Sequence, residues 1–333
     1  MALLARAERW EMKYFYDEAE SELAINDFVF PTAGRGVAVG FVSRGERTRG
    51  TAVVTSDGGA NWSLVPLPDT GLSVFFLNDS LGWVVTPKGI YRTAEGGRGW
   101  RKLPKSPRGA LRVWFLDPLH GYAAGLRKSI HETTDGGKSW KPLPAVGEIK
   151  TSGEYTAFTS ISFAGPVGYI TGWSRPPRPD DSELPEWMEP ERAVRRREYP
   201  NVSVLVATRD GGKTWETSIV SIFGHVARVR LSPDGRALGL IEFRNAMPNP
   251  SEVIHIDLKS GQGASVYADK LRAVTDIALI RSGPAYLAAS EVAGRIRAPI
   301  PGRLRMLVSE DLKLWREMEV DYRANAQIGR AHV

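Results

Sequence analysis

The sequence contains no cysteine, and its apolar runs are short. Without cysteine, the chain has no disulfide, no thiolate nucleophile and no cysteine-ligated zinc or iron–sulfur cluster. A membrane-spanning helix needs about 20 predominantly apolar residues in a row, so no transmembrane segment is predicted. The first residues carry only four apolar side chains between Met1 and Arg6, and no secretory signal is visible. The compartment is left open, and an extracytoplasmic location is compatible with an incomplete N-terminus.

A large excess of one charge is also lacking. The 333 residues include 44 Lys and Arg against 38 Asp and Glu, a net charge of +6, which is modest for a nucleic-acid-binding protein. With 42% hydrophobic and 25% charged residues, the composition is that of a folded globular protein. No P-loop and no Gly-x-Ser-x-Gly motif occurs, and the five histidines lack metal-ligand spacing. The sequence therefore predicts no cofactor, no metal site and no nucleic-acid partner.

An internal repeat dominates what is present. An octet that begins with Thr and ends with Trp occurs four times, and a shortened fifth copy begins with Ser309. The acidic residue and the Trp of the five copies are Asp57 and Trp62, Glu95 and Trp100, Asp135 and Trp140, Asp210 and Trp215, and Asp311 and Trp315. Because five of the ten Trp close these copies, the repeat is a structural unit, and its period decides the fold.

A second pattern precedes most of the octets. An apolar strand is followed by Gly and an aromatic or aliphatic pair, as in Val74–Leu77 with Gly82–Val85, and Val113–Leu116 with Gly121–Ala124. Each unit then holds four short strands joined by turns. One small sheet cannot bury both of its faces, and radial stacking of such sheets solves this problem. The sequence therefore predicts an all-β fold, a β-propeller of six or seven four-stranded blades.

The units also give a domain map. We expect an N-terminal segment, 1–27, with a strand around 10–16 that closes the ring, a propeller over 28–320, and a tail, 321–333, that need not be native. A seventh unit could begin in this tail, so a truncated C-terminus is left open. The expected blades are 28–68, 73–104, 111–144, 159–220, 226–268 and 272–320, with an insertion at 174–200 in the fourth.

The octet resembles the Asp-box, also called the bacterial neuraminidase repeat. Together with the preceding Gly–aromatic strand pair, it is most similar to the photosystem II stability and assembly factor family and its relatives in non-photosynthetic bacteria. The resemblance implies a propeller whose Asp-box residues are structural, on the face opposite to the functional sites. Sialidases and xyloglucan hydrolases share the repeat, so the resemblance does not transfer a function.

Basic residues recur in one class of loop. In a four-stranded blade, the loop between strands two and three shares a face with the loop that leads to the next blade. Such loops predict a basic, partner-binding face, and the alternative is that these side chains are merely solvated. The candidate residues are Arg44, Arg47, Lys88, Arg127, Lys128, Arg175, Arg178, Arg244, Arg295 and Arg297, joined by Trp187 of the insertion.

The insertion is too long for a simple connector, so a lid or a partner-docking arm is one interpretation, and a packed cover over the ring is the other. The predicted function is a non-enzymatic scaffold for protein–protein interaction, such as an assembly or stability factor, with a partner that is anionic. No catalytic residue is assigned. The alternative is a sialidase- or xyloglucanase-like glycoside hydrolase or a carbohydrate-binding propeller, for which Asp180, Asp181, Glu183 and Glu186 are the candidate carboxylates.

Overall fold

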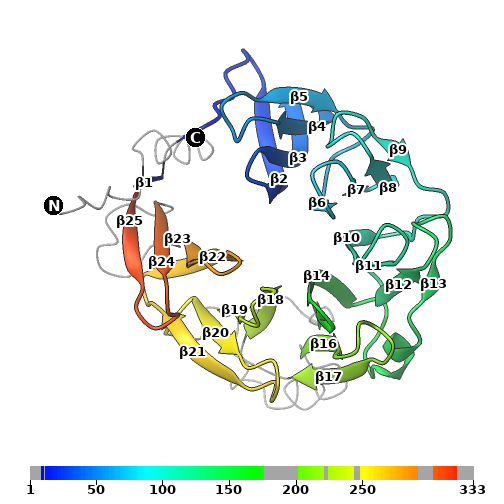
Figure 1. The fold of residues 1–333 in the computed structure, drawn as a ribbon, viewed down its shortest axis with the longest axis vertical. Helices are drawn as coiled ribbons and strands as arrows, with labels where there is room; N and C mark the ends of the chain where they lie inside the picture. Colours follow the sequence, from blue (N-terminus) through cyan, green and yellow to red (C-terminus); the bar gives the residue numbers. More distant parts are fainter. Residues whose placement is uncertain are drawn as a thin grey trace, which may run out of the picture.

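The computed structural model describes residues 9–10, 12–175, 202–220, 224–243, 248–291 and 303–320, with side chains from residue 12 onward. These residues form six sheets arranged in a ring (Figure 1). The predicted all-β propeller is therefore confirmed, with six four-stranded blades. Its described part contains one helical element, the short 3-10 helix η1, Pro144–Glu148.

Each blade is an antiparallel meander of four consecutive strands. Blade 1 contains β2 (Glu22–Thr32), β3 (Arg35–Arg44), β4 (Arg47–Thr55) and β5 (Ser63–Pro66). Blade 2 contains β6 (Ser73–Phe76), β7 (Gly82–Thr86), β8 (Gly89–Thr93) and β9 (Arg101–Lys102). Blade 3 contains β10 (Ala110–Phe115), β11 (Gly121–Gly125), β12 (Ser129–Thr133) and β13 (Lys141–Pro142).

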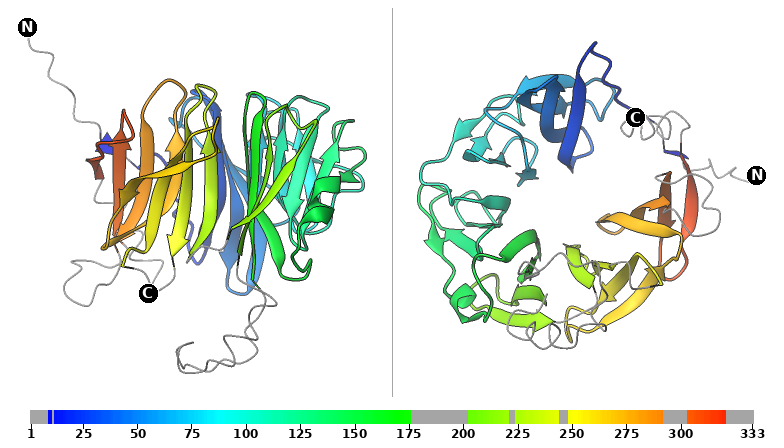
Figure 2. Two further views of the ribbon diagram at one scale, coloured as in Figure 1. Left: turned by 90° about the horizontal axis from the view of Figure 1, so that it is seen from below. Right: turned by 180° about the vertical axis from the view of Figure 1, so that it is seen from behind.

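The second half of the ring repeats this order. Blade 4 contains β14 (Thr156–Ala164), β15 (Val167–Ser174), β16 (Val202–Thr208) and β17 (Glu216–Val220). Blade 5 contains β18 (Gly224–Leu231), β19 (Ala237–Phe243), β20 (Ser251–Ile256) and β21 (Gly263–Ala268). Blade 6 contains β22 (Arg272–Leu279), β23 (Ala285–Glu291), β24 (Leu304–Ser309) and β25 (Arg316–Val320). The first strand of every blade is the innermost one, and the fourth lies at the periphery (Figures 1 and 2).

The glycine of the Gly–aromatic pattern has a packing function. A Cβ added at Gly121 would lie 2.6 Å from the ring of Phe115, which belongs to the first strand of the same blade. The same conflict, at 2.2–2.7 Å, would arise at Gly36, Gly82 and Gly168 against Phe30, Phe76 and Phe163. Only glycine leaves room for this ring, and for that reason the pattern recurs.

The aromatic residue after this glycine joins one blade to the next. Trp83 of blade 2 stacks on Phe115 of blade 3, with ring centroids 3.7 Å apart. Tyr122 of blade 3 stacks on Phe163 of blade 4 at 5.5 Å. Such contacts are part of five apolar clusters, one for each junction from blades 1 and 2 to blades 5 and 6. The core of the protein is thus divided among the junctions between blades.

The junction between blades 6 and 1 differs from the other five. One first-strand position pairs with the residue two places after the first Gly or Ala of the second strand. In blades 2–6 this position is at most 9% exposed, and it is occupied by Val74, Val113, Ile161, Val229 and Ile277. In blade 1 this position is Phe28, which is 63% exposed. In the described part of the chain, no strand of blade 6 packs extensively on blade 1. Among the described residues, blades 6 and 1 therefore lack the shared apolar cluster that joins the other blades. A sixth cluster, with Met306, Val308 and Met318, lies within blade 6 itself.

The N-terminal segment connects blade 6 to blade 1. Strand β1, Arg9–Trp10, pairs in parallel with β25 as a fifth strand of blade 6. The chain then runs to blade 1, where Tyr14 contacts Trp62 with ring centroids 6.0 Å apart. Figure 1 shows this path from β1 to β2. The predicted tail, 321–333, lies outside the described residues.

Candidate protein-binding rim

The propeller has two rims that differ in chemistry. On one rim, the turn between the second and third strands contacts the connection between blades. Leu126 N donates a hydrogen bond to Gly109 O at 2.9 Å, and Lys128 N donates to Thr156 O at 2.8 Å. On the other rim, the Asp-box turn contacts the first hairpin turn of its own blade, as in the bond from Gly136 N to Leu119 O at 2.8 Å. Loops that are distant in sequence thus gather on common rims.

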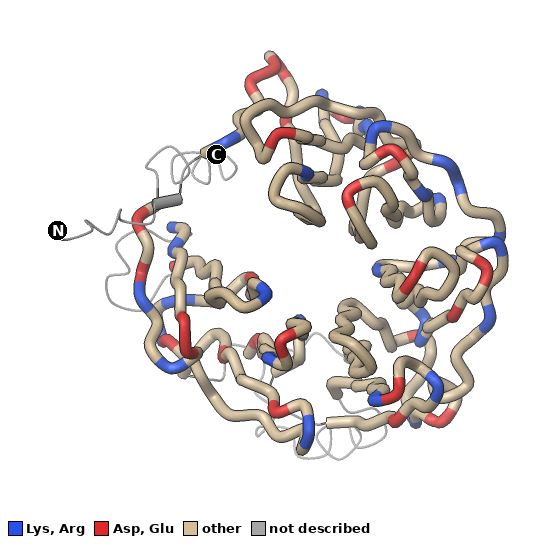
Figure 3. The backbone as a smooth tube through the Cα atoms, in the orientation of Figure 1, with Lys and Arg blue, Asp and Glu red and all other residues tan. Residues whose placement is uncertain are grey.

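We define the basic rim by the candidate residues that the structure describes on the first of these rims. They are Arg44, Arg47, Lys88, Arg127, Lys128 and Arg175. The other candidates, Arg178, Trp187, Arg244, Arg295 and Arg297, lie outside the described residues. Along the described part of the ring, Lys and Arg are interspersed with Asp and Glu (Figure 3), in keeping with a net charge of only +6.

Two residues of the basic rim are exposed and uncommitted. The side chains of Arg47 and Arg127 make no hydrogen bond or ion pair with another residue in the described ranges. Arg127 and its neighbour Lys128 adopt positive φ angles of 59° and 57° in the turn after β11. Arg127 is exposed in this turn, whereas Lys128 is half-buried.

Other members of the basic rim hold its loops together. Lys128 Nζ donates to the carbonyl oxygens of Ile149 and Thr151, in the connection to blade 4. Lys88 Nζ lies 3.7 Å from Asp69 Oδ2, and Arg44 Nη2 donates to Ala19 O at 3.0 Å. These three basic side chains therefore stabilise loops of the protein. Their positions in the sequence did not indicate this structural role.

The basic rim borders a cavity of about 660 Å3 on blade 1. Its lining combines Arg44, Arg47 and Arg49 with Val42 and Leu64, and it includes one carboxylate, that of Glu18. The N-terminal segment forms one wall, where the Tyr16 hydroxyl hydrogen-bonds to Ser21 Oγ at 2.9 Å. The sequence did not indicate this cavity, because it depends on how that segment folds back over blade 1.

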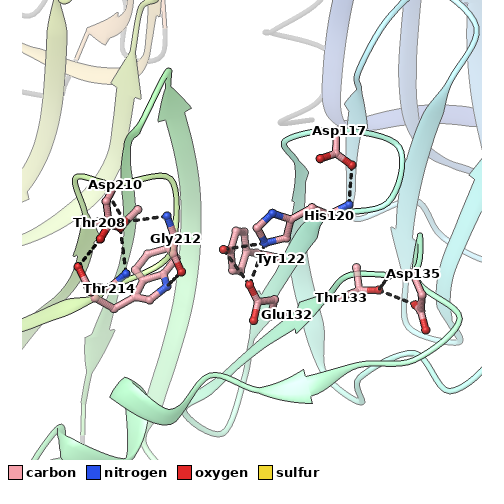
Figure 4. Close-up of polar contacts among 11 residues, drawn as sticks. Asp117, His120, Tyr122, Glu132, Thr133, Asp135, Thr208, Asp210, Gly212 and Thr214 are labelled. Carbon is pink, nitrogen blue, oxygen red and sulfur yellow. Dashed lines mark hydrogen bonds and ion pairs between the residues drawn. The ribbon is translucent and has the colours of Figure 1, made fainter.

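The Asp-box turns form the other rim, and the carboxylates of four of them, Asp57, Asp135, Asp210 and Asp311, accept hydrogen bonds within the turn. In the fifth turn, Glu95 instead donates its backbone N–H to Thr93 Oγ1. Thr133 Oγ1 donates to Asp135 Oδ1 at 2.9 Å and accepts a bond from Gly137 N at 2.9 Å. The Asp135 carboxylate also accepts bonds from the backbone N–H and the hydroxyl of Ser139. The turn at Asp210 repeats this arrangement, and Figure 4 shows both turns.

These hydrogen bonds stabilise the ionised carboxylates. The Ser139 hydroxyl and backbone N–H lower the pKa of Asp135 to about 2. The pKa values of Asp57 and Asp210 are also lowered to about 2, by bonds from Asn61 and from Thr214 respectively. A carboxylate with all its oxygens committed to turn donors, and with a depressed pKa, is poorly suited to act as a general acid.

A polar cluster between blades 3 and 4 was missed by the sequence analysis. His120 Nε2 lies 2.8 Å from Glu132 Oε1, and the Tyr122 hydroxyl donates to the same carboxylate oxygen at 3.1 Å (Figure 4). Burial and the nearby charge of Glu132 raise the pKa of Tyr122. His120 and Glu132 carried no motif, and the register of β11 and β12 brings them together. The cluster provides hydrogen-bond partners for the hydroxyl of the buried Tyr122, so its role is structural.

Within the described ranges, no group of three or more His, Asp or Glu side chains has an arrangement that could hold a metal ion. The candidate carboxylates Asp180, Asp181, Glu183 and Glu186 lie outside these ranges. The part of the chain that the structure describes contains no helix long and apolar enough to cross a bilayer.

Six meandering sheets with these turns define the class of protein, an Asp-box β-propeller. Within that class, residues 108–177 match the family model of the photosynthesis system II assembly factor YCF48. The resemblance inferred from the octets and the Gly–aromatic strands is thereby confirmed. No curated protein is significantly similar in sequence to the chain.

Solved structures share the fold at low sequence identity. YCF48 bound to D1 peptide has a TM-score of 0.57 and 18% identity, with 91% of this chain and 85% of that chain covered. YCF48 from Cyanidioschyzon merolae has a TM-score of 0.54 and 17% identity, with coverages of 92% and 86%. The GH74 xyloglucanase from Xanthomonas campestris has a TM-score of 0.54 and 14% identity, and the match covers 85% of this chain but 46% of that chain.

Proposed function

We propose that this protein is a non-catalytic scaffold that binds an anionic segment of a protein partner on the basic rim, as an assembly or stability factor for a larger complex. The observation that carries the proposal is the pair Arg47 and Arg127. Both side chains are exposed on one rim without a partner in the described residues. Guanidinium groups favour carboxylates, because their donors match the two carboxylate oxygens.

Two further observations support the proposal. Among its described lining residues, the adjoining cavity combines three arginines with apolar side chains and one carboxylate, that of Glu18. Such a lining suits an extended acidic peptide with an apolar residue. A structurally similar protein, YCF48, has been observed bound to a D1 peptide. A propeller of this fold can therefore hold a peptide, and we extend this type of ligand to the present chain.

A charge-reversal experiment tests the proposal. The variant Arg44→Glu, Arg47→Glu and Arg127→Glu is compared with the wild-type chain in affinity capture from the source organism. The matched control is Arg98→Glu, Lys138→Glu and Lys213→Glu, which makes the same change in net charge at exposed positions of the Asp-box rim. The proposal expects the first variant to lose partners that the control retains. Identical partners for both variants would refute it.

The glycoside hydrolase alternative rests on the fold shared with the GH74 xyloglucanase. Retaining or inverting hydrolysis requires two carboxyl groups about 5–9.5 Å apart in a cleft, whereas the cavity on blade 1 contributes one. Assays of the intact chain on xyloglucan and on chromogenic sialosides address this alternative. Turnover that survives the basic-rim variant would favour it over the scaffold.

A further inference from the structure

The innermost strands carry a cluster of charged residues that the basic rim does not include. Arg112 lies on β10, and Arg228 and Arg230 lie on β18, while Asp27 and Asp276 lie on β2 and β22. Asp27, Arg112, Arg228 and Asp276 all follow a β-bulge at the same level of their strands. Because these strands line the centre of the ring (Figure 1), four blades place charged residues around one central space.

Arg228 and Arg230 lie on the same side of β18. The pairing with β19 is regular from Arg228 to Leu231, so alternate residues share a face. The residue between them, Val229, is buried in the apolar cluster between blades 4 and 5. The two arginines therefore lie on the other side of the strand, toward blade 6, where Arg228 forms an ion pair with Asp276 at 2.5 Å.

The protein satisfies most members of this cluster, but not Arg230. Asp27 accepts bonds from the backbone N–H of Phe28 and of Val74, both at 3.1 Å. Arg112 Nη1 donates to Leu111 O at 3.0 Å. The backbone of Arg230 pairs with Leu238 in the sheet, but its side chain makes no hydrogen bond and no ion pair with any described residue. A guanidinium has five N–H donors, so Arg230 leaves a strong donor set without a protein acceptor.

The charges of the cluster act on one another. Burial and the nearby charge of Arg228 lower the pKa of Arg230 to about 10, and Arg112 acts in the same direction. Burial also lowers the pKa of Arg112, with a further contribution from Arg228. Among these five described side chains, three arginines face two aspartates in a partly dehydrated space. An anion placed there would relieve the repulsion between the arginines.

From this arrangement we propose that Arg230, together with Arg228 and Arg112, binds a small oxyanion, a phosphate or a carboxylate, at the centre of the ring. The site is distinct from the basic rim, and it does not depend on the proposed function. Phosphate and carboxylate oxygens match the planar donor set of a guanidinium. Such an anion could be free in solution or be the carboxylate of another polypeptide, and the ligand chemistry is the same in both cases.

Calorimetric titration of the intact chain tests the proposal. Inorganic phosphate and succinate are the two probes, and ionic strength is held constant with sodium chloride so that screening is equal throughout. Binding of either probe is expected for the wild-type chain and for Arg98→Gln, a control at an exposed position of the Asp-box rim. Arg230→Gln is expected to weaken binding at least tenfold. Phosphate binding alone indicates a free inorganic ligand, and succinate binding indicates a carboxylate.

A second variant reverses the direction of the expected effect. Asp276→Asn removes the carboxylate that pairs with Arg228, so it should increase the affinity for the anion several-fold. If Arg230→Gln does not fold, Arg112→Gln replaces it, with the same expected loss. The proposal is overturned if the wild-type chain binds neither probe, if the arginine variants bind as tightly as the wild type, or if Asp276→Asn weakens binding.

Discussion

The phenol of Tyr122 in blade 3 occupies the space that a side chain at Gly212 of blade 4 would need. A Cβ at Gly212 would lie 2.0 Å from the Tyr122 oxygen. Gly212 is the second glycine of its Asp-box, and its φ angle is +92°. The Asp-box turn of one blade is therefore fitted to the Gly–aromatic strand of the preceding one, which links the two sequence patterns in three dimensions.

This fit makes Gly212→Ala strongly destabilising. The positive φ and the overlap with Tyr122 together should lower the free energy of unfolding by about 2–4 kcal/mol. Gly211→Ala is the matched control, because Gly211 also has a positive φ, +75°, and no atom lies within 4 Å of its added Cβ. That control should lose about 1 kcal/mol. Urea denaturation measures both variants.

Removing the phenol oxygen of Tyr122 should restore part of the stability that Gly212→Ala loses. In the background of Tyr122→Phe, the nearest remaining ring atom to the added Cβ is the carbon that carried the oxygen, at 3.1 Å. Tyr122→Phe alone should cost about 1 kcal/mol, the usual net contribution of a hydrogen bond. Additive losses in the double variant would show that the overlap between the two residues is not the cause.

The Asp-box carboxylates should make stability depend on pH at the acid end. Their pKa values of about 2 in the folded protein lie below the ordinary value of 3.8. The stabilisation is therefore fully present above about pH 4–5, and it is lost as the pH falls toward 2. Asp135→Asn should lower the midpoint of urea denaturation at pH 6, and the difference from the wild type should shrink between pH 4 and 2. A difference that is constant with pH would contradict this origin.

The neighbouring residues Lys128 and Arg127 on the basic rim allow a matched test of which side chain stabilises the loop. Lys128→Met removes the ammonium that donates to Ile149 O and Thr151 O, and it should lower the free energy of unfolding by about 1–2 kcal/mol. Arg127→Met, at nearly the same φ and in the same turn, should change stability by less than about 0.5 kcal/mol. Equal losses in thermal or urea denaturation would show that Lys128 does not stabilise this loop.

The junction between blades 6 and 1 is tested by equivalent positions in two blades. Ile161 is 4% exposed between blades 3 and 4, so Ile161→Ala should lower the free energy of unfolding by about 2–5 kcal/mol. Phe28 occupies the corresponding position in blade 1 and is 63% exposed, so Phe28→Ala should cost less than about 0.5 kcal/mol. A large loss for Phe28→Ala would mean that the flank of blade 1 is covered in solution.

The fold could be predicted from the sequence because its signals are local and repeated. The Thr-x-Asp-x-Gly-x-x-Trp turn and the Gly–aromatic strand each encode their own geometry, and six consecutive meanders follow from their spacing. The loops between second and third strands were placed on one rim by the same periodicity. What each loop side chain does was not predictable, as the contrast between Arg127 and Lys128 shows.

Contacts between distant segments were equally hidden from the sequence. The wall that Tyr16 and Glu18 form at the cavity depends on the path of the N-terminal segment across blade 1. The convergence of Arg112, Arg228 and Asp276 depends on bulges in three separate inner strands. Neither arrangement has a local motif, because both arise from ring geometry and strand register.

Because no described strand of blade 6 packs extensively on blade 1, the described blades form a linear rather than a circular series of contacts. In a linear array of units that contact only their neighbours, the terminal units are each supported on one side, and opening proceeds inward from them. Amide hydrogen exchange should therefore be fastest in β2–β5 and β22–β25 and slowest in β10–β17. The N-terminal segment connects the two terminal blades, because β1 pairs with β25 of blade 6 and Tyr14 contacts Trp62 of blade 1. Deleting the residues before Glu22 should therefore accelerate amide exchange in both terminal blades.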